Sequence, residues 1–309
     1  MKKPVFFLPA LFAAILCCLI FYFVFGRGDA YAQKAGSGPA LVTRTAMTSS
    51  VNPHVETPGL GSKFSSAAGR NYGLRRSLSW AFAGKAQTGW QIYVPLISHT
   101  IETSSHPDSP QFAAALSIWQ GKNSLISDGV LDSDTLQSFV QHWQSQRLGR
   151  SGSPGEDRLL AAPITNFYDS TRDAELLHLE RETYAAYKQL LAAAAKDLGE
   201  SIRFTKSGEL ADGEKLLRIV SAYRSPAYQA ALRRREPNAG RGALAKFSTH
   251  ATGQALDLYV GGEPVSTKDP NRLLQVESPT YKWLVKNANK YGFYNYFYEP
   301  WHWEYVPGR

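Results

Sequence analysis

Two short stretches in the last part of the chain decide the fold: Ser248-Thr249-His250-Ala251-Thr252-Gly253-Gln254-Ala255-Leu256-Asp257 and Glu299-Pro300-Trp301-His302. Together they supply two imidazoles and two carboxylates. Two imidazoles and one carboxylate are a common ligand set for a catalytic zinc ion, whose fourth position stays open. The second carboxylate is then available as a base, which a purely structural zinc site does not need. The two stretches are therefore expected to form one metal-dependent active site.

The spacing of these residues indicates how they meet. His250 and Asp257 lie on either side of Gly253. Because glycine allows a tight turn or a close backbone approach, the two side chains can converge from a loop and the strand behind it. The spacing is not the His-x-x-x-His pattern of a zincin helix. His302 is expected on a neighbouring strand, since Pro300 disfavours a continuing helix. The residues predict a zinc ion held by His250, Asp257 and His302.

Glu299 is the carboxylate left for proton transfer. Zinc lowers the pKa of its bound water toward neutrality, and a nearby carboxylate can take the water's proton and pass it to the leaving amine. Arg224 lies in Ser221-Ala222-Tyr223-Arg224-Ser225, which we place at the end of a strand. This arginine could stabilise the charge of a tetrahedral intermediate, or bind the terminal carboxylate of a peptide.

The remaining aromatic and histidine side chains are interpreted mainly as structural residues. The aromatic residues Tyr223 and Trp301 are expected to pack in the core or to line the pocket wall, where they are candidate substrate contacts. A single histidine is most often a structural residue. We interpret the remaining histidines in that way: His54, His99, His106, His142 and His178.

The composition narrows the class of protein. The chain has 309 residues, enough for one large domain or two ordinary ones. Its two cysteines are Cys17 and Cys18, so the rest has no disulfide and no thiolate zinc site. A formal net charge of +8 suits an anionic partner such as a cell-wall polymer. A nucleic-acid partner is not expected, since the one basic run, Arg233-Arg234-Arg235, reads as a solvated helix face.

The N-terminus predicts export. Lys2 and Lys3 precede an apolar stretch, Val5 to Phe25, and Ala30-Tyr31-Ala32 offers a small-x-small cleavage site. Residues 1–32 are therefore expected to be a signal peptide. The apolar stretch is also long enough to remain as an uncleaved membrane anchor. The protein is expected in the periplasm or cell envelope, either released or anchored to the inner membrane.

Three further segments follow the export signal. Residues 33–75 are rich in small and polar residues and are expected to be a flexible linker. Residues 76–150 are expected to form a small, mainly helical module, with a short strand at Trp90–Leu96. Within the module, Gln111–Arg147 predicts helix, Asp-Gly turn, helix. This resembles the small peptidoglycan-binding module of cell-wall hydrolases, while an ordinary helical hairpin packed on the main domain is the alternative.

Residues 160–309 are expected to form the zinc peptidase domain, of α+β class. The helices are expected at 173–198, with Thr171 or Asp173 as cap, from Ser225-Pro226 onward, and at 280–290. The strands are expected at 216–220, at 255–260 and at 301–306.

Four motifs occur in order: Ser221-Ala222-Tyr223-Arg224-Ser225, Ser248-x-His250-x-x-Gly253-x-Ala255-x-Asp257, Lys290-Tyr291-Gly292-Phe293 and Glu299-Pro300-Trp301-His302-x-x-Tyr305. Together they resemble the VanY-type D-alanyl-D-alanine carboxypeptidases of the LAS metallopeptidase group, over residues 173–306. The resemblance implies a small antiparallel sheet with flanking helices. It also implies one zinc ion per chain on the three ligands named above and a glutamate general base.

The resemblance further implies that Arg224 binds substrate and stabilises the transition state, with Ser248 helping to hold the substrate. Alanine at position 222 replaces the usual glycine, and the loops at 233–247 and 293–299 depart from the usual pattern. The change at position 222 is small and is expected to be tolerated, whereas the two loops bear on the exact specificity. The expected substrate is a peptidoglycan stem peptide, cleaved by a D,D-carboxypeptidase. The alternatives are an endopeptidase or a D-Ala-D-Ala dipeptidase of the same group, and a non-catalytic cell-wall-binding protein.

Overall fold

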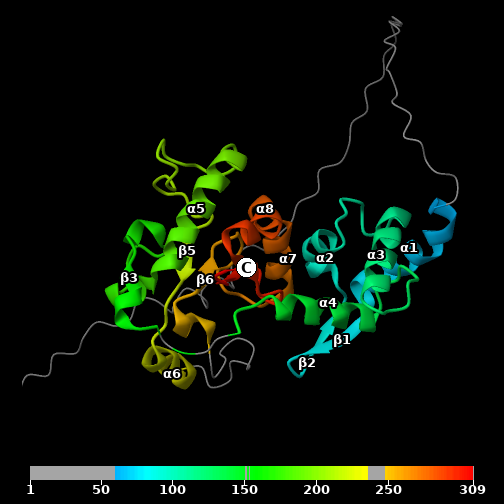
Figure 1. The fold of residues 1–309 in the computed structure, drawn as a ribbon, viewed down its shortest axis with the longest axis horizontal. Coiled ribbons are helices and arrows are strands. Elements are labelled where there is room, and N and C mark those ends of the chain that lie inside the picture. Colours follow the sequence, from blue (N-terminus) through cyan, green and yellow to red (C-terminus); the bar gives the residue numbers. More distant parts are fainter. Residues whose placement is uncertain (1–59, 150–151, 153, 236–247, 309) are drawn as a thin grey trace, which may run out of the picture. The chain divides into compact units, whose positions relative to one another are not determined.

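A computed structural model describes residues 60–149, 152, 154–235 and 248–308 of the chain (Figure 1). The expected export signal, and the expected linker before residue 60, lie outside the described residues. Within the described part, no helix is both long enough and apolar enough to cross a membrane.

The described residues form a mixed helix and sheet structure, and the expected α+β class is confirmed. The helices are α1 (Leu60–Ser77), α2 (Val94–Thr100), α3 (Pro110–Lys122), α4 (Ser133–Ser145), α5 (Arg181–Asp197), α6 (Pro226–Arg235), α7 (Asp269–Glu277) and α8 (Pro279–Asn287). The strands are β1 (Ser79–Phe82), β2 (Lys85–Thr88), β3 (Leu159–Ala161), β4 (His178–Glu180), β5 (Ile219–Ser221), β6 (Ala255–Leu258), β7 (Phe293–Asn295) and β8 (His302–Tyr305).

The central element is a four-stranded antiparallel sheet with the order β5-β6-β8-β7. Strand β6 is buried at all four of its positions, as expected for a strand with neighbours on both sides and packing on both faces. Two smaller antiparallel pairs, β1 with β2 and β3 with β4, lie outside this sheet. The small antiparallel sheet that the motifs implied is therefore present.

Helix α5 begins later than its apolar pattern predicts. The pattern indicates a start near Asp173, but residues 174–177 form a short 3-10 turn and His178–Glu180 form β4. Hydrogen bonding of β4 to β3 keeps this segment extended. The side chain of Glu180 then caps the helix by accepting a hydrogen bond from the Thr183 backbone at 3.0 Å.

Two expectations for the N-terminal region are corrected. The expected linker extended to residue 75, whereas α1 already begins at Leu60. The expected strand at Trp90–Leu96 is helical instead, a 3-10 turn followed by α2. Pro95 lies in the first turn of α2, where its missing N–H costs nothing, and Trp90 is buried in a stack with Phe112 of α3.

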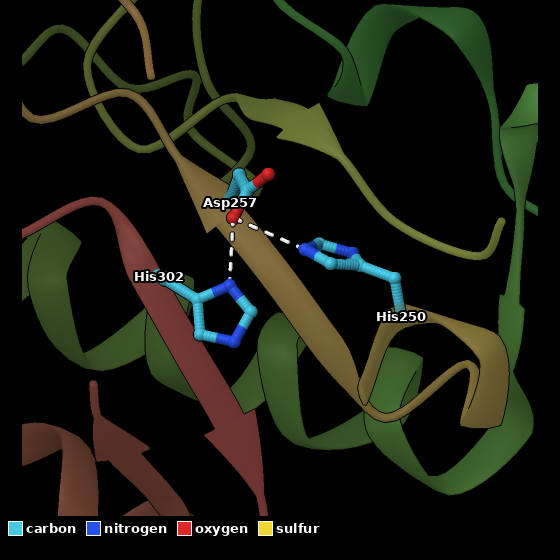
Figure 2. A group of neighbouring side chains, drawn as sticks. All are labelled: His250, Asp257 and His302. Atoms are coloured by element: carbon cyan, nitrogen blue, oxygen red, sulfur yellow. Dashed lines mark hydrogen bonds and ion pairs between the residues drawn. The ribbon is translucent and has the colours of Figure 1, made fainter. Parts of the chain in front are cut away.

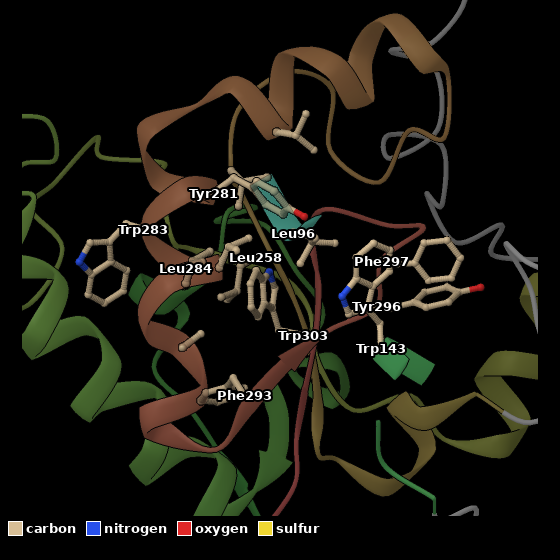
Figure 3. Packing of buried hydrophobic residues seen from close by; sticks show 14 of the residues in the cluster. Leu96, Trp143, Leu258, Tyr281, Trp283, Leu284, Phe293, Tyr296, Phe297 and Trp303 are labelled. Carbon is tan, nitrogen blue, oxygen red and sulfur yellow. The ribbon is translucent and has the colours of Figure 1, made fainter. Parts of the chain in front are cut away.

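The expected helical hairpin corresponds to α3 and α4. Each helix begins at a side-chain cap: Ser109 accepts from the Phe112 backbone and Asp132 accepts from the Thr135 backbone. The hairpin shares its core with the peptidase strands and helices, since one hydrophobic cluster runs from Leu78 to Trp303. Figure 3 shows Leu96 and Trp143 in this cluster beside Phe297 and Trp303. The hairpin thus packs against residues of the peptidase region, and its suggested binding of peptidoglycan stays a prediction.

Candidate active site

The sheet places two of the predicted metal ligands opposite each other. Asp257 on β6 pairs directly with His302 on β8, and also with Ser221 on β5. Directly opposed residues of antiparallel strands bring their Cβ atoms to about 5 Å, so the two side chains share one face. His250 comes from a 3-10 turn, Thr249–Thr252, that leads into β6. The predicted convergence of a loop and two strands is what the structure contains.

The three side chains form a buried group that could hold a metal ion (Figure 2). One ligating atom of each residue lies within 4.8 Å of the others. The Asp257 Oδ1 atom is 3.2 Å from His250 Nε2 and 2.9 Å from His302 Nδ1. Within the described residues, this is the one group of three or more such side chains.

Hydrogen bonds determine which ring nitrogen of each histidine faces Asp257. The Nδ1 atom of His250 is 2.6 Å from the carbonyl oxygen of Ala222, so it carries the hydrogen and Nε2 has a free lone pair. His302 is turned the other way. Its Nε2 atom lies 3.2 Å from Glu304 Oε1 and 3.3 Å from Thr249 Oγ1, and its Nδ1 atom faces Asp257. Both rings are oriented as metal-bound imidazoles usually are.

Electrostatics hold two of the three candidate ligands, His250 and Asp257, in the form that binds a metal. Burial and the charge of Arg224 lower the pKa of His250 to about 4, so this ring is neutral at pH 7. Burial would raise the pKa of Asp257, but the charge and hydrogen bonds of the histidines hold it well below its usual value. Burial would lower the pKa of His302, but its hydrogen bonds to Asp257 and Glu304 raise it to about 9. A metal ion bound here would release a proton from His302.

Glu299 has the electrostatic properties of a base that works near neutral pH. Its carboxylate is partly buried, and this desolvation raises its pKa from 4.5 to about 7. The charges of His302 and Arg224 lower the pKa, and that of Asp257 raises it, so the carboxylate lies within electrostatic reach of the metal group. A backbone turn fixes its position, since the Glu299 N–H donates to Tyr296 and its carbonyl accepts from the His302 N–H.

Arg224 lies beside the metal group, but one part of it is already engaged. Its Nη2 atom donates to the outer oxygen of Asp257, Oδ2, at 2.8 Å, and its Nε atom donates to Ser221 Oγ at 2.9 Å. The side chain therefore holds Asp257 with Oδ1 turned toward both histidines. The hydrogen bonds recorded among the described residues engage its Nε and Nη2 atoms, and none of them involves Nη1.

The three candidate substrate contacts Ser248, Tyr223 and Trp301 lie in different surroundings. The Ser248 hydroxyl caps the turn that carries His250, accepting from the His250 N–H at 3.3 Å, so it has a structural part to play. Tyr223 is half-buried, and its backbone N–H donates to the His178 carbonyl oxygen. Trp301 is buried in the turn before β8. Their roles as substrate contacts remain predictions.

Glu304 is a functional residue that was not among the candidates predicted from the sequence. This side chain is fully buried and lies 3.2 Å from His302 Nε2. Side chains two residues apart on a strand share a face, so the spacing of His302 and Glu304 on a predicted strand was the available signal. Its partner Arg147 lies two residues after the end of α4, and no sequence pattern links the two.

Gly253 makes the turn between His250 and β6 possible. Its φ is +69°, and an added Cβ would lie 2.9 Å from the Glu180 backbone nitrogen. We expect Gly253→Ala to lower the free energy of unfolding by about 1–3 kcal/mol, from the left-handed backbone and the crowding together. Urea unfolding of the chelated protein checks this, with Gly69→Ala on α1, where the space is open, as the control. An unchanged unfolding free energy for Gly253→Ala would contradict this explanation of the turn.

Comparison with known proteins finds a family match for the C-terminal part of the chain that contains the site. Residues 176–308 match the model of the VanY family, described as D-alanyl-D-alanine carboxypeptidase. These residues form a VanY-type domain. The VanY-type domain contains every predicted ligand, the candidate base and Arg224. The recognition made from the four motifs is confirmed, and with it a peptidase of this type.

The other comparisons add less. A solved structure, titled "Structure of the LdcB LD-carboxypeptidase reveals the molecular basis of peptidoglycan recognition", is similar at 24% identity and a TM-score of 0.35. The similarity covers 50% of this chain and 69% of the other. No curated protein matches the chain.

Proposed function

We propose that this protein is an exported, zinc-dependent D,D-carboxypeptidase that removes the terminal D-alanine from peptidoglycan stem peptides. The observation that carries the proposal is the buried group of His250, Asp257 and His302 in a VanY-type domain, with Glu299 within electrostatic reach. A binding protein would have no use for a carboxylate with a raised pKa beside such a group. The family description supplies the substrate class, and the predicted signal or anchor supplies the location.

The residues divide the chemistry as follows. His250 Nε2, Asp257 Oδ1 and His302 Nδ1 would hold the metal. When bound, the metal supplies a Lewis acid that polarises the attacking water and the scissile carbonyl. The Glu299 carboxylate takes the proton from the attacking water and returns it to the leaving amine nitrogen of D-alanine. A pKa near 7 suits both steps, because the group can accept and release a proton at neutral pH.

Arg224 supplies the remaining positive charge. Its Nη1 atom would donate either to the oxyanion that develops on the scissile carbonyl or to the terminal carboxylate of the substrate. Both roles depend on the ion pair with Asp257, which fixes the guanidinium plane.

A substrate panel tests the proposal. Zinc-loaded protein is incubated with a stem pentapeptide ending in D-Ala-D-Ala, the corresponding tetrapeptide, cross-linked muropeptide and free D-Ala-D-Ala, and the products are weighed by mass spectrometry. We expect loss of a single alanine from the pentapeptide. Preferred cleavage of the tetrapeptide, of the cross-link or of the free dipeptide would keep the peptidase and replace the substrate. If no substrate is cleaved while zinc is bound, the wall-binding interpretation replaces the enzyme.

The raised pKa of Glu299 also predicts how stability changes with pH. Folding favours the protonated form of Glu299, so the contribution of this group to the stability of the chelated protein falls as the pH rises from about 4.5 and levels off above about 7. The shift corresponds to about 3 kcal/mol, at about 1.36 kcal/mol for each pH unit. Glu299→Gln removes this loss. The free energy of unfolding is measured in urea at pH 4.5 and at pH 8. From the lower to the higher pH, the difference between Glu299→Gln and wild type should change by about 2–3 kcal/mol in favour of the variant.

The exposed Glu277 of α7 provides the matched control. Glu277→Gln is expected to follow wild type at both values of pH. If the difference between Glu299→Gln and wild type is the same at pH 4.5 and at pH 8, the assigned pKa of Glu299 is wrong.

A further inference from the structure

The chain segment that leaves α4 reaches a buried carboxylate of the peptidase sheet. Arg147 donates to Glu304 Oε1 through Nε, at 3.2 Å, and through Nη2. The backbone N–H of Leu148 donates to the other oxygen, Oε2, at 2.9 Å. The Glu304 side chain is 0% exposed, so the charge of Arg147 is its main compensation.

This carboxylate lies on the side of His302 that faces away from the other metal ligands. The His302 Nε2 atom is 3.2 Å from Glu304 Oε1, while Nδ1 is 2.9 Å from Asp257 Oδ1. A carboxylate attracts the N–H of an imidazole and leaves the opposite nitrogen with its lone pair. Glu304 therefore selects the nitrogen of His302 that can bind a metal. Thr249 Oγ1, at 3.3 Å from Nε2, is a weaker and uncharged partner.

Arg147 is held in place by groups other than Glu304. Its Nη1 atom donates to Gln144 Oε1 at 3.0 Å, and its guanidinium lies 4.0 Å from the centre of the Tyr296 ring. The Tyr296 ring in turn lies edge-on to His302, with ring centres 6.0 Å apart. The side chain is 23% exposed, so it is partly desolvated and oriented before any ligand binds.

We propose that Arg147 and Glu304 are a positioning pair that fixes the metal-binding tautomer of His302, so the N-terminal helical region completes the metal site. The proposal rests on the proposed metal-dependent function. In this arrangement the helical region, residues 60–148, is part of the enzyme. Without the arginine, Glu304 is a buried charge lacking its cation, so its carboxylate turns away from His302, and His302 loses the partner that orients its ring.

The first test measures zinc affinity and does not depend on activity. Zinc is competed from the full chain by a chromogenic chelator for wild type, Glu304→Gln, Arg147→Met and Arg147→Lys. Loss of an outer-shell partner typically weakens metal binding by about 10–100-fold, and we expect this for Glu304→Gln and Arg147→Met. Arg147→Lys keeps the charge and should recover part of the affinity. Arg76→Met, an exposed arginine at the end of α1, is the matched control and should bind like wild type.

The second test identifies the ligating nitrogen and remains informative if Glu304→Gln does not fold. The zinc-loaded chain, with 15N in its histidines, is examined by long-range proton–nitrogen NMR, and His302 is assigned by loss of its signals in His302→Gln. We expect His302 to bind through Nδ1 and to carry a hydrogen on Nε2, while His250 binds through Nε2. In Arg147→Met, the Nε2–H signal of His302 should shift or broaden, and in Arg147→Lys it should return toward its wild-type position.

The outcomes separate this proposal from the proposed function. Unchanged affinity in both Arg147→Met and Glu304→Gln, or ligation of His302 through Nε2 in wild type, would overturn the positioning pair alone. Weakened affinity in a protein that cleaves no peptide would support the pair and overturn the proposed function. A wild-type chain that binds no zinc would overturn both.

Discussion

Glu299→Gln is expected to lower kcat for release of D-alanine from a stem pentapeptide by about 10³-fold, within the range of 10²–10⁴ typical of general bases. Glutamine keeps the shape of the side chain but cannot accept the proton of the attacking water. The ligands His250, Asp257 and His302 are untouched, so the bound zinc should stay at one ion per chain. Steady-state kinetics with D-alanine detection and metal analysis of the same sample check both statements.

Glu277→Gln on α7 is the control, since it removes an exposed carboxylate away from the metal group. It should leave kcat within about twofold of wild type, as expected of a surface substitution. A fall of less than tenfold in Glu299→Gln would mean that another group accepts the proton. A fall accompanied by loss of zinc would mean that Glu299 acts in metal binding instead.

Asp257→Asn is expected to abolish both metal binding and activity. The carboxylate oxygen Oδ1 contacts both histidines, and Oδ2 holds Arg224. An amide in this place loses the charge that compensates both the metal and the arginine. We expect zinc affinity to fall by more than about 100-fold, beyond the usual effect of an outer-shell residue, and kcat to fall with it. Treatment of wild type with a chelator should give the same inactivity, and added zinc should reverse it.

Asp212→Asn, at an exposed position, is the matched control and should keep its zinc. Because breaking a buried ion pair also costs about 3–5 kcal/mol of stability, the fold of Asp257→Asn is checked by circular dichroism before metal analysis. A folded Asp257→Asn protein that retains one zinc ion and most of its activity would contradict the assigned ligands.

The sequence was most informative where side-chain chemistry and strand geometry agree. His250, Asp257 and His302 were predicted from residue type and spacing, and the structure brings them within 4.8 Å of one another. These ligands meet through a glycine turn and two neighbouring strands, so the order of the motifs in the sequence was enough to predict that they converge. The same local logic predicted α3, α4 and the helix that begins at Pro226.

The sequence was least informative where tertiary contacts outweigh local preference. The apolar and aromatic residues of Trp90–Leu96 indicate a strand, but burial of Trp90 against Phe112 and the position of Pro95 favour helix. The start of α5 depends on pairing of β4 with β3, which the helical pattern of the segment does not reveal. In both segments the secondary structure is decided by packing against residues that are distant in the sequence.

The contact of Arg147 with Glu304 belongs to the same class. A single arginine just after a helix, such as Arg147 after α4, is usually a surface residue, so the sequence alone gives no reason to pair it with Glu304. The contact arises because the helical region and the peptidase sheet share one hydrophobic core. Its chemical meaning depends on a distance, 3.2 Å from Glu304 to His302, that only the fold supplies.

The most direct test of the central claim is mass spectrometry of one stem pentapeptide ending in D-Ala-D-Ala. It is incubated with zinc-loaded wild type, with chelated wild type, and with zinc-loaded Glu299→Gln. We predict loss of a single alanine with the first sample and an intact peptide with the other two. Equal loss of alanine from the chelated protein, or from Glu299→Gln, would contradict a zinc carboxypeptidase that uses Glu299 as its base.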